Sequence, residues 1–346
     1  MRALTFPTRL AILSALLVLA NLAAWVCAFA MFHDQPVLLG TAWLAYAFGL
    51  RHACDADHIA AIDNVTRKLM QEGRRPVAVG FFFALGHSTV VALAVAGIAA
   101  TATMLVAHFE EFHRIGSVLG TTVSALFLSV IAFANLAALR STWRNLQGLR
   151  RGKTFDNDLD PQPAAGGLLA WIFGPMFRLV RRSWQMFPIG FLFGLGFDTA
   201  TEVALLGMSA TQAATGLSIW SILILPALFA AGMSLVDTAN GVLMLSAYSG
   251  AFTKPIRKLY YNLMITFMSV IVAFAISGIQ VLGLVGGWLG LSGELWDVVE
   301  TLSENFNVLG FAIVGFFFFV WFSSVVLYRY LGKDDLEIKK LGTDAR

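Results

Sequence analysis

The stretch that decides the fold class is Leu10 to Phe32, LAILSALLVLANLAAWVCAFAMF, which contains no charged residue. A bilayer core about 30 Å thick needs roughly 20 helical residues, and this run is long enough to cross it. It is also longer than the apolar core of a signal peptide, about 7–15 residues, and it shows no convincing cleavage site. We therefore expect a first transmembrane helix that the protein retains.

The rest of the chain has the same apolar character. Of its 346 residues, 58% are apolar and 13% are charged, whereas a soluble domain carries about 25% charged residues. This composition excludes a soluble enzyme and a disordered chain, and two cysteines in apolar stretches do not suggest a disulfide framework. The net charge of +3 comes from scattered basic residues, a pattern that does not favour nucleic-acid binding. We expect an all-α membrane protein, because open β-structure leaves backbone groups unpaired in lipid.

We predict a single transmembrane domain, residues 1–346, with eight membrane-spanning helices. The predicted helices cover residues 10–32, 38–62, 77–105, 116–140, 186–212, 218–247, 259–285 and 306–330. The longest connection, residues 141–185, is expected to contain a flexible linker at 151–163 and an interfacial helix at 168–182, where aromatic and basic residues alternate.

Lysine and arginine give the predicted helices an orientation. Segments on one side of the membrane hold 22 of the 24 basic residues. Because cytoplasmic loops carry the excess of Lys and Arg, we expect both termini in the cytoplasm. The opposite loops are acidic, which either concentrates cations there or is an ordinary solvated surface.

Ionisable and polar side chains gather inside four of the predicted helices. A charge at membrane depth costs about 2.5–3.5 kcal/mol, so each one needs a reason. These residues are Arg51, His52, Cys54, Asp55, Asp57 and His58 in the second helix, His87 in the third, Asp198 and Glu202 in the fifth, and Asp237 and Asn240 in the sixth.

The second helix offers a set of metal ligands. On a regular helix, His52, Asp55 and His58 span an arc of about 120°, with Asp55 central. His87 on the next helix would add a third imidazole. Imidazole with carboxylate suits nickel, cobalt or zinc and suits calcium or magnesium poorly.

Asp57 projects about 160° away from Asp55 on the same regular helix. It could pair with Arg51 or orient a histidine as a hydrogen-bond acceptor. The alternative interpretation of the whole cluster is that Arg51, Asp55 and Asp57 only neutralise one another. The two histidines among these carboxylates make a metal site the stronger hypothesis.

The other intramembrane polar residues suggest a transport path. Asp198 and Glu202 are four residues apart and would share a helix face, from which they could relay the ion or a proton. Asp237 and Asn240 are similar candidates, although all four could instead form interhelical hydrogen bonds. Asn135 is expected to be such a hydrogen-bonding residue and nothing more.

A short repeated motif suggests internal symmetry. Phe48-Gly49-Leu50 precedes the His/Asp cluster, and Phe193-Gly194-Leu195 precedes Asp198 and Glu202. The two helices are predicted to cross the membrane in opposite directions, as related elements of an inverted repeat would.

The segment 51–64, RHACDADHIAAIDN, resembles the signature of the nickel/cobalt transporter (NiCoT) family, His-x-x-x-x-Asp-His. The resemblance extends through LGHS at 85–88, GFDTATE at 196–202 and GMSLVDT at 232–238, and it covers nearly the whole chain. It is greatest to the high-affinity nickel permeases that supply hydrogenase and urease maturation.

This resemblance implies eight membrane helices and uptake of Ni²⁺, possibly Co²⁺, across the bacterial inner membrane. It implies that His52, Asp57 and His58 are the signature residues and that His87 takes part in metal selection. The helix geometry favours Asp55 as a ligand, whereas the signature stresses Asp57, and a helix broken near Gly49 would let both reach the ion. 

This sequence departs from the family pattern at two positions. Cys54 replaces the usual Val or bulky apolar residue, and Asn240 replaces a second Asp that many members carry. Both departures bear on the preference among metals and leave the transport of a divalent cation unchanged as the expectation.

Three functions are compatible with this chain: an uptake permease, an exporter and an intramembrane metalloenzyme. For the permease, the expected partners are a divalent transition-metal cation as substrate and the surrounding membrane lipid. The first is an uptake permease that has no resident cofactor and is not an enzyme, and the chain carries no phosphate-loop motif for ATP hydrolysis. The second is nickel or cobalt efflux, but related exporters tend to have a histidine-rich cytoplasmic loop, and 141–185 contains no histidine. The third is an intramembrane metalloenzyme, but His-Glu-x-x-His is absent.

Overall fold

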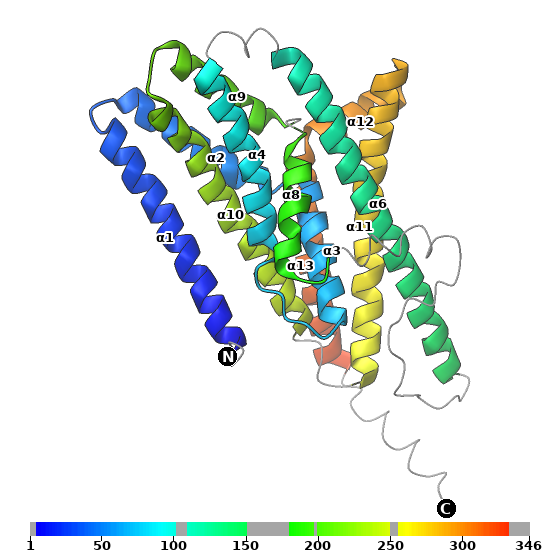
Figure 1. The fold of residues 1–346 in the computed structure, drawn as a ribbon. Coiled ribbons are helices and arrows are strands. Elements are labelled where there is room, and N and C mark those ends of the chain that lie inside the picture. Colours follow the sequence, from blue (N-terminus) through cyan, green and yellow to red (C-terminus); the bar gives the residue numbers. More distant parts are fainter. Residues whose placement is uncertain (1–4, 102–108, 151–179, 197–198, 250–254, 332–346) are drawn as a thin grey trace, which may run out of the picture.

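A computed structural model describes residues 5–101, 109–150, 180–196, 199–249 and 255–331, and these residues form a bundle of helices (Figure 1). The helices are α1 (Phe6–Phe32), α2 (Pro36–His52), α3 (Ala56–Gln71), α4 (Val79–Thr101), α6 (Phe109–Arg150), the short 3-10 turn η1 (Ser183–Gln185), α8 (Met186–Gly194), α9 (Ala200–Ala214), α10 (Ile219–Ser249), α11 (Pro255–Leu289), α12 (Glu294–Glu304) and α13 (Phe306–Leu331). No β-strand occurs within the described ranges. The prediction of an all-α membrane protein is confirmed.

Five helices in the described part of the chain are long and apolar enough to cross a bilayer. They contain the stretches Phe6–Phe32, Val79–Ala100, Ile115–Ala137, Ile219–Ser246 and Thr266–Leu289. Two further predicted spans, 38–62 and 186–212, are each divided into two shorter helices. The count of eight spans therefore stays a prediction.

The prediction of one continuous helix over 38–62 is wrong. Helix α2 ends at His52, and α3 begins at Ala56 and continues to Gln71. Asp55 between them has an extended backbone (φ −65°, ψ 144°) and makes no side-chain cap to α3, because its Oδ2 contacts His52 instead. The length of the apolar stretch predicts a membrane segment here, but it carries no information on a helix break within that segment. At this break the side chains of His52, Asp55 and His58 are buried inside the bundle.

The predicted helix 186–212 is interrupted in the same way. Helix α8 ends at Gly194, and α9 begins at Ala200 after Thr199, whose backbone is also extended (φ −93°, ψ 142°). Asp198 lies outside the described residues, so the expectation that it shares a helix face with Glu202 is not tested. Figure 1 shows α2 and α8 running into the middle of the bundle from opposite ends.

Close glycine contacts hold these two broken units against their neighbours. A Cβ at Gly49 of α2 would collide with the carbonyl of Phe229 on α10, and one at Gly232 of α10 would lie 2.8 Å from the carbonyl of Tyr46 on α2. Helices α4 and α8 show the same reciprocal pattern through Gly86 and Gly190. Gly49 of α2 and Gly190 of α8 therefore hold the same packing position in the two broken units, whereas the repeated motif aligns Gly49 with Gly194. An inverted repeat stays a prediction, with this different register.

The long connection begins later than predicted. Helix α6 continues to Arg150, so the first part of the segment 141–185 is helical. The predicted linker and most of the predicted interfacial helix lie outside the described residues. The first residue of α1 and the last residue of α13 lie at the same end of the bundle (Figure 1).

Candidate metal site

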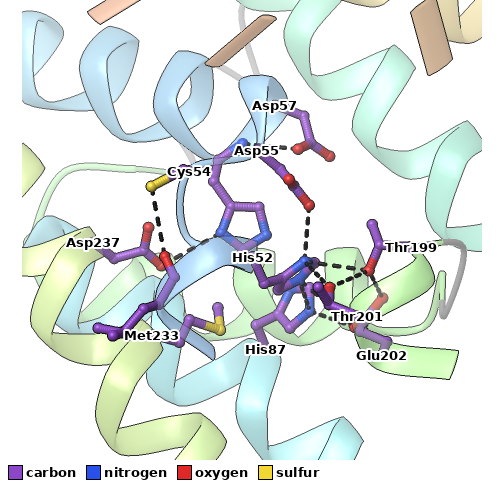
Figure 2. Close-up of polar contacts among 12 residues, drawn as sticks. His52, Cys54, Asp55, Asp57, His87, Thr199, Thr201, Glu202, Met233 and Asp237 are labelled. Atoms are coloured by element: carbon purple, nitrogen blue, oxygen red, sulfur yellow. Dashed lines mark hydrogen bonds and ion pairs between the residues drawn. The ribbon is translucent and has the colours of Figure 1, made fainter. Parts of the chain in front are cut away.

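The two helix breaks meet α4 and α10 in the interior of the bundle, and the predicted ligands converge there (Figure 2). His52 is the last residue of α2, and His58 lies in the first turn of α3. His87 projects from α4, and Glu202 lies in the first turn of α9. The four side chains are at most 4% exposed, so they form an enclosed polar site among apolar helices.

The three imidazoles form a triangle. The ring centres of His52, His58 and His87 are 4.6 to 4.9 Å apart, and one ligand atom from each ring lies within 4.8 Å of the others. The sequence predicted this grouping, but for a wrong reason, since a regular helix face does not carry His52 and His58. The helix break brings them together instead.

Glu202 contacts two of these rings directly. Its Oε1 lies 2.8 Å from His87 Nε2 and 3.7 Å from His52 Nε2, and the two Nε2 atoms are 3.0 Å apart. Two ligands about 2.1 Å from a metal are about 3.0 Å apart at a right angle and about 3.4 Å apart at the tetrahedral angle. These three atoms therefore already have the spacing of ligands on one transition-metal ion.

Asp55 orients His52 from the opposite side of the ring. Its Oδ2 lies 2.8 Å from His52 Nδ1. A proton on Nδ1 donates to this carboxylate, which leaves the lone pair of Nε2 directed toward His87 and Glu202. Asp55 thus acts on the nitrogen that does not face the other rings.

Two threonines that sequence reasoning did not select complete this arrangement. Thr199 Oγ1 donates a hydrogen bond of 3.0 Å to Glu202 Oε2, and it also lies 3.3 Å from His52 Nδ1. Thr201 Oγ1 lies 3.4 Å from the same nitrogen. Both residues stand in the GFDTATE stretch, but threonine is common in helices and gave no separate signal. They fix the rotamers of Glu202 and His52.

Asp237 brings α10 into the site through His58. Its Oδ2 lies 3.4 Å from His58 Nδ1, whereas its Oδ1 is buried without a hydrogen-bond partner. Asn240, one turn further along α10, is 9% exposed, and neither atom of its amide has a partner. Buried polar atoms without partners are uncommon in folded proteins, so this part of α10 has free capacity to bind.

Asp57 does not join the imidazole triangle. Its Oδ1 accepts a hydrogen bond from the backbone N–H of His58 at 3.0 Å. Its Oδ2 faces α6 and α11, where Ser124 Oγ is 3.4 Å away and Gln280 Nε2 is 3.5 Å away. The structure thus gives the two carboxylates different surroundings, with Asp55 on the histidine and Asp57 at the start of α3.

The remaining predicted residues lie at the edge of the site. Arg51 is exposed, and Cys54 is half-buried, with its thiol donating to the carbonyl of Leu50 at 3.5 Å. Met233, which the sequence analysis did not select, is fully buried, and its sulfur accepts a hydrogen bond from Ser88 at 3.6 Å. Figure 2 shows Met233 on the side of the site where Asp237 lies.

The donor set has the chemistry of a transition-metal site. Neutral imidazole nitrogens with one or two carboxylate oxygens bind borderline divalent ions such as Ni²⁺, Co²⁺ and Zn²⁺. Several ionisable groups this deep in an apolar bundle need compensation, which a bound divalent cation would provide.

Comparison with known proteins agrees with this chemistry. Residues 38–327 match the family model described as NicO, high-affinity nickel-transport protein. The chain is 54% identical over 332 residues to a high-affinity nickel transport protein of Cupriavidus necator, covering 96% of this chain and 95% of that protein. It is 52% identical over 316 residues to the hydrogenase nickel incorporation protein HupN of Bradyrhizobium diazoefficiens, covering 91% and 83%.

A cobalt relative is also found. The chain is 42% identical over 297 residues to the cobalt transport protein NhlF of Rhodococcus rhodochrous, covering 85% of this chain and 84% of that protein. No solved structure matches. The family match and these similarities across most of the chain establish that it belongs to the NicO high-affinity nickel-transport family.

Proposed function

We propose that this chain is a permease that carries Ni²⁺, and secondarily Co²⁺, into the bacterial cytoplasm. The observation that carries the proposal is the close approach of His52 Nε2, His87 Nε2 and Glu202 Oε1 in the bundle interior. Relatives named for nickel transport and one named for cobalt transport support the choice of ions. Efflux, the alternative considered from the sequence, finds no support in these comparisons.

The proposed binding step uses four ligands. His52, His87 and Glu202 would coordinate the ion with little movement, because their donor atoms are already at ligand spacing. His58 completes the set from α3, and its Nδ1 stays close to Asp237. Asp55 and Thr199 act through their neighbours, the first by holding the tautomer of His52 and the second by orienting Glu202.

The proposed path continues along α10. After the imidazole triangle, Asp237 Oδ1 and the Asn240 amide are the next buried oxygen donors, and none of their atoms is already occupied. Oxygen donors bind Ni²⁺ less tightly than imidazole does, so a transfer in this direction releases the ion. Asp198 stands close in sequence to Glu202 and belongs to the same proposed path.

The proposed membrane placement follows from the basic residues. With 22 of 24 lysines and arginines on one side, both termini face the cytoplasm of a multi-pass protein in the inner membrane. A divalent cation that moves inward gains about 4.6 kcal/mol per 100 mV of membrane potential. The metal is thus proposed as cargo and not as a resident cofactor, and this chain needs no ATPase motif of its own.

The test is uptake of radioactive nickel-63 into cells that express the full chain, with the amount of folded protein measured by size-exclusion chromatography. His52→Ala and His87→Ala should each abolish saturable uptake. His33→Ala is the matched control, because His33 is an exposed histidine paired with Asp34 at 3.0 Å. Uptake by either buried-histidine variant equal to that of His33→Ala would overturn the proposal.

A further inference from the structure

A cavity of about 560 Å³ lies at the end of the bundle where α1 begins, well away from the imidazole triangle. Three separate segments form it, namely the start of α1, the connection between α3 and α4, and the residues before η1. Five of its lining residues are arginines: Arg9, Arg74, Arg75, Arg181 and Arg182. None of its lining residues is acidic.

Contacts between the three segments hold these arginines around the cavity. The guanidinium of Arg75 stacks over the ring of Phe6 with 5.6 Å between the carbon Cζ and the ring centre. The guanidinium of Arg74 donates to the carbonyl of Arg181. The backbone N–H groups of Arg181 and Arg182 both donate to Gln185 Oε1, at 2.6 and 2.9 Å.

The carboxylate of Glu72 offsets only part of this charge. Glu72 lies 3.5 Å from Lys68 and 3.7 Å from Arg74, so it is already shared between two cations. The 27-residue helix α1 begins at the cavity, and Thr5 makes no side-chain cap to its backbone N–H groups. Helix N-termini and arginine guanidinium groups both favour phosphate oxygens. The cavity therefore fits a phosphate-bearing anion.

We propose that this arginine cavity binds the phosphate headgroup of an anionic phospholipid from the adjacent leaflet. Trp184, which follows the lining residue Ser183 in the chain, is 53% exposed, and exposed tryptophan is typical of the membrane–water interface. From the cavity, α1 carries exposed apolar side chains such as Ile12 and Leu16 toward the membrane interior, which gives the acyl chains a surface. Basic pockets between membrane helices bind such headgroups. The inference is independent of which metal the protein transports.

Thermal unfolding of the purified full chain in detergent tests the proposal, with phosphatidylglycerol, phosphatidylcholine or inorganic phosphate added. Phosphatidylglycerol should raise the melting temperature, and the other two should not. The variant Arg75→Gln/Arg182→Gln should need roughly 30-fold more phosphatidylglycerol for the same rise, since two basic contacts are lost.

The matched control is Arg140→Gln/Arg144→Gln, which removes the same charge from the exposed end of α6. It should respond as the parent does, and an equal loss in both double variants would reduce the effect to general electrostatics and overturn the proposal. A rise with inorganic phosphate alone would assign the cavity to a free anion and overturn the lipid source. If the glutamine variant does not fold, equal rises with phosphatidylglycerol and phosphatidylcholine on the parent overturn it.

Discussion

Two buried polar clusters each include residues of helix α3. They differ in how their hydrogen-bond donors and acceptors are paired. The first is the imidazole triangle with its carboxylates. The second, which we call the α3 network, consists of Asp63, Asn64, Arg67, Asn135, Thr266 and Ser269, which are 0 to 5% exposed. Burial and polarity therefore do not distinguish the two clusters.

In the α3 network, donors face acceptors. Ser269 donates to Asp63 at 2.8 Å, and Asn135 and Arg67 donate to Asn64 Oδ1 at 2.5 and 3.4 Å. Arg67 also donates to Thr266 at 3.0 Å. The network links α3 to α6 and α11 and includes its own cation. These paired contacts are those of a network that stabilises the fold.

Around the imidazole triangle, acceptors outnumber donors. His52 Nε2, His87 Nε2 and Glu202 Oε1 lie within 3.7 Å of one another, and when His52 keeps its proton on Nδ1, a proton on His87 Nε2 is the one donor among them. Asp237 Oδ1 has no partner. Such an arrangement is costly without a cation and favourable with one. Unpaired acceptor capacity, and not burial of polar groups alone, therefore distinguishes the candidate metal site from the α3 network.

The largest expected effect comes from removing the acceptor charge in the site. Glu202→Gln should lower nickel uptake at least about a hundredfold, because a ligand and its negative charge are lost together. Its melting temperature should stay the same or rise, since a buried charge is removed from a site rich in acceptors and the amide can keep the hydrogen bond from Thr199. The matched change Asp63→Asn in the α3 network should lower the melting temperature. A lower melting temperature for Glu202→Gln together with an unchanged one for Asp63→Asn would contradict the comparison of the two clusters.

The next effect tests orientation of a ligand by its neighbour. Asp55→Asn should weaken nickel affinity about 10- to 100-fold, because the His52 tautomer is no longer fixed. The apparent KM for uptake should rise more than the maximal rate falls. An unchanged KM would mean that Asp55 does not act through His52.

A third variant separates stability from transport. Asn135→Leu removes the donor to Asn64 and should cost about 1–3 kcal/mol of folding free energy. Uptake per folded molecule should stay within about twofold of the parent. Chemical unfolding and uptake measured on the same membranes check both statements, and a large loss of uptake at normal stability would place the α3 network in the path.

The smallest effect is expected at Cys54. Its thiol donates to the Leu50 carbonyl and is not part of the triangle, so Cys54→Val should change nickel uptake less than twofold. Competition between nickel and cobalt, measured on parent and variant, gives the result. A clear shift in preference would show that the thiol reaches the metal during transport.

Composition and rare residue types predict the membrane class, which the structure confirms, and most of the residues of the candidate metal site. Charged and imidazole groups inside apolar helices are conspicuous, and His52, His58 and His87 were selected on that basis. Thr199, Thr201 and Met233 were missed because hydroxyls and thioethers are ordinary in such helices. Glu202 was selected for the path and not as a ligand, because its distance from His87 depends on long-range packing.

The sequence by itself determined that the chain lies in a membrane and that its buried histidines and carboxylates suit a transition metal. The cost of placing charge in lipid makes those residues informative without coordinates. Only the tertiary structure decided that helices break at Asp55 and Thr199, that Asp55 and not Asp57 holds His52, and that Glu202 joins two imidazoles. The contacts of Glu202 join residues more than a hundred positions apart. The Asp55–His52 contact is local but depends on the helix break, and periodicity along one helix encodes neither feature.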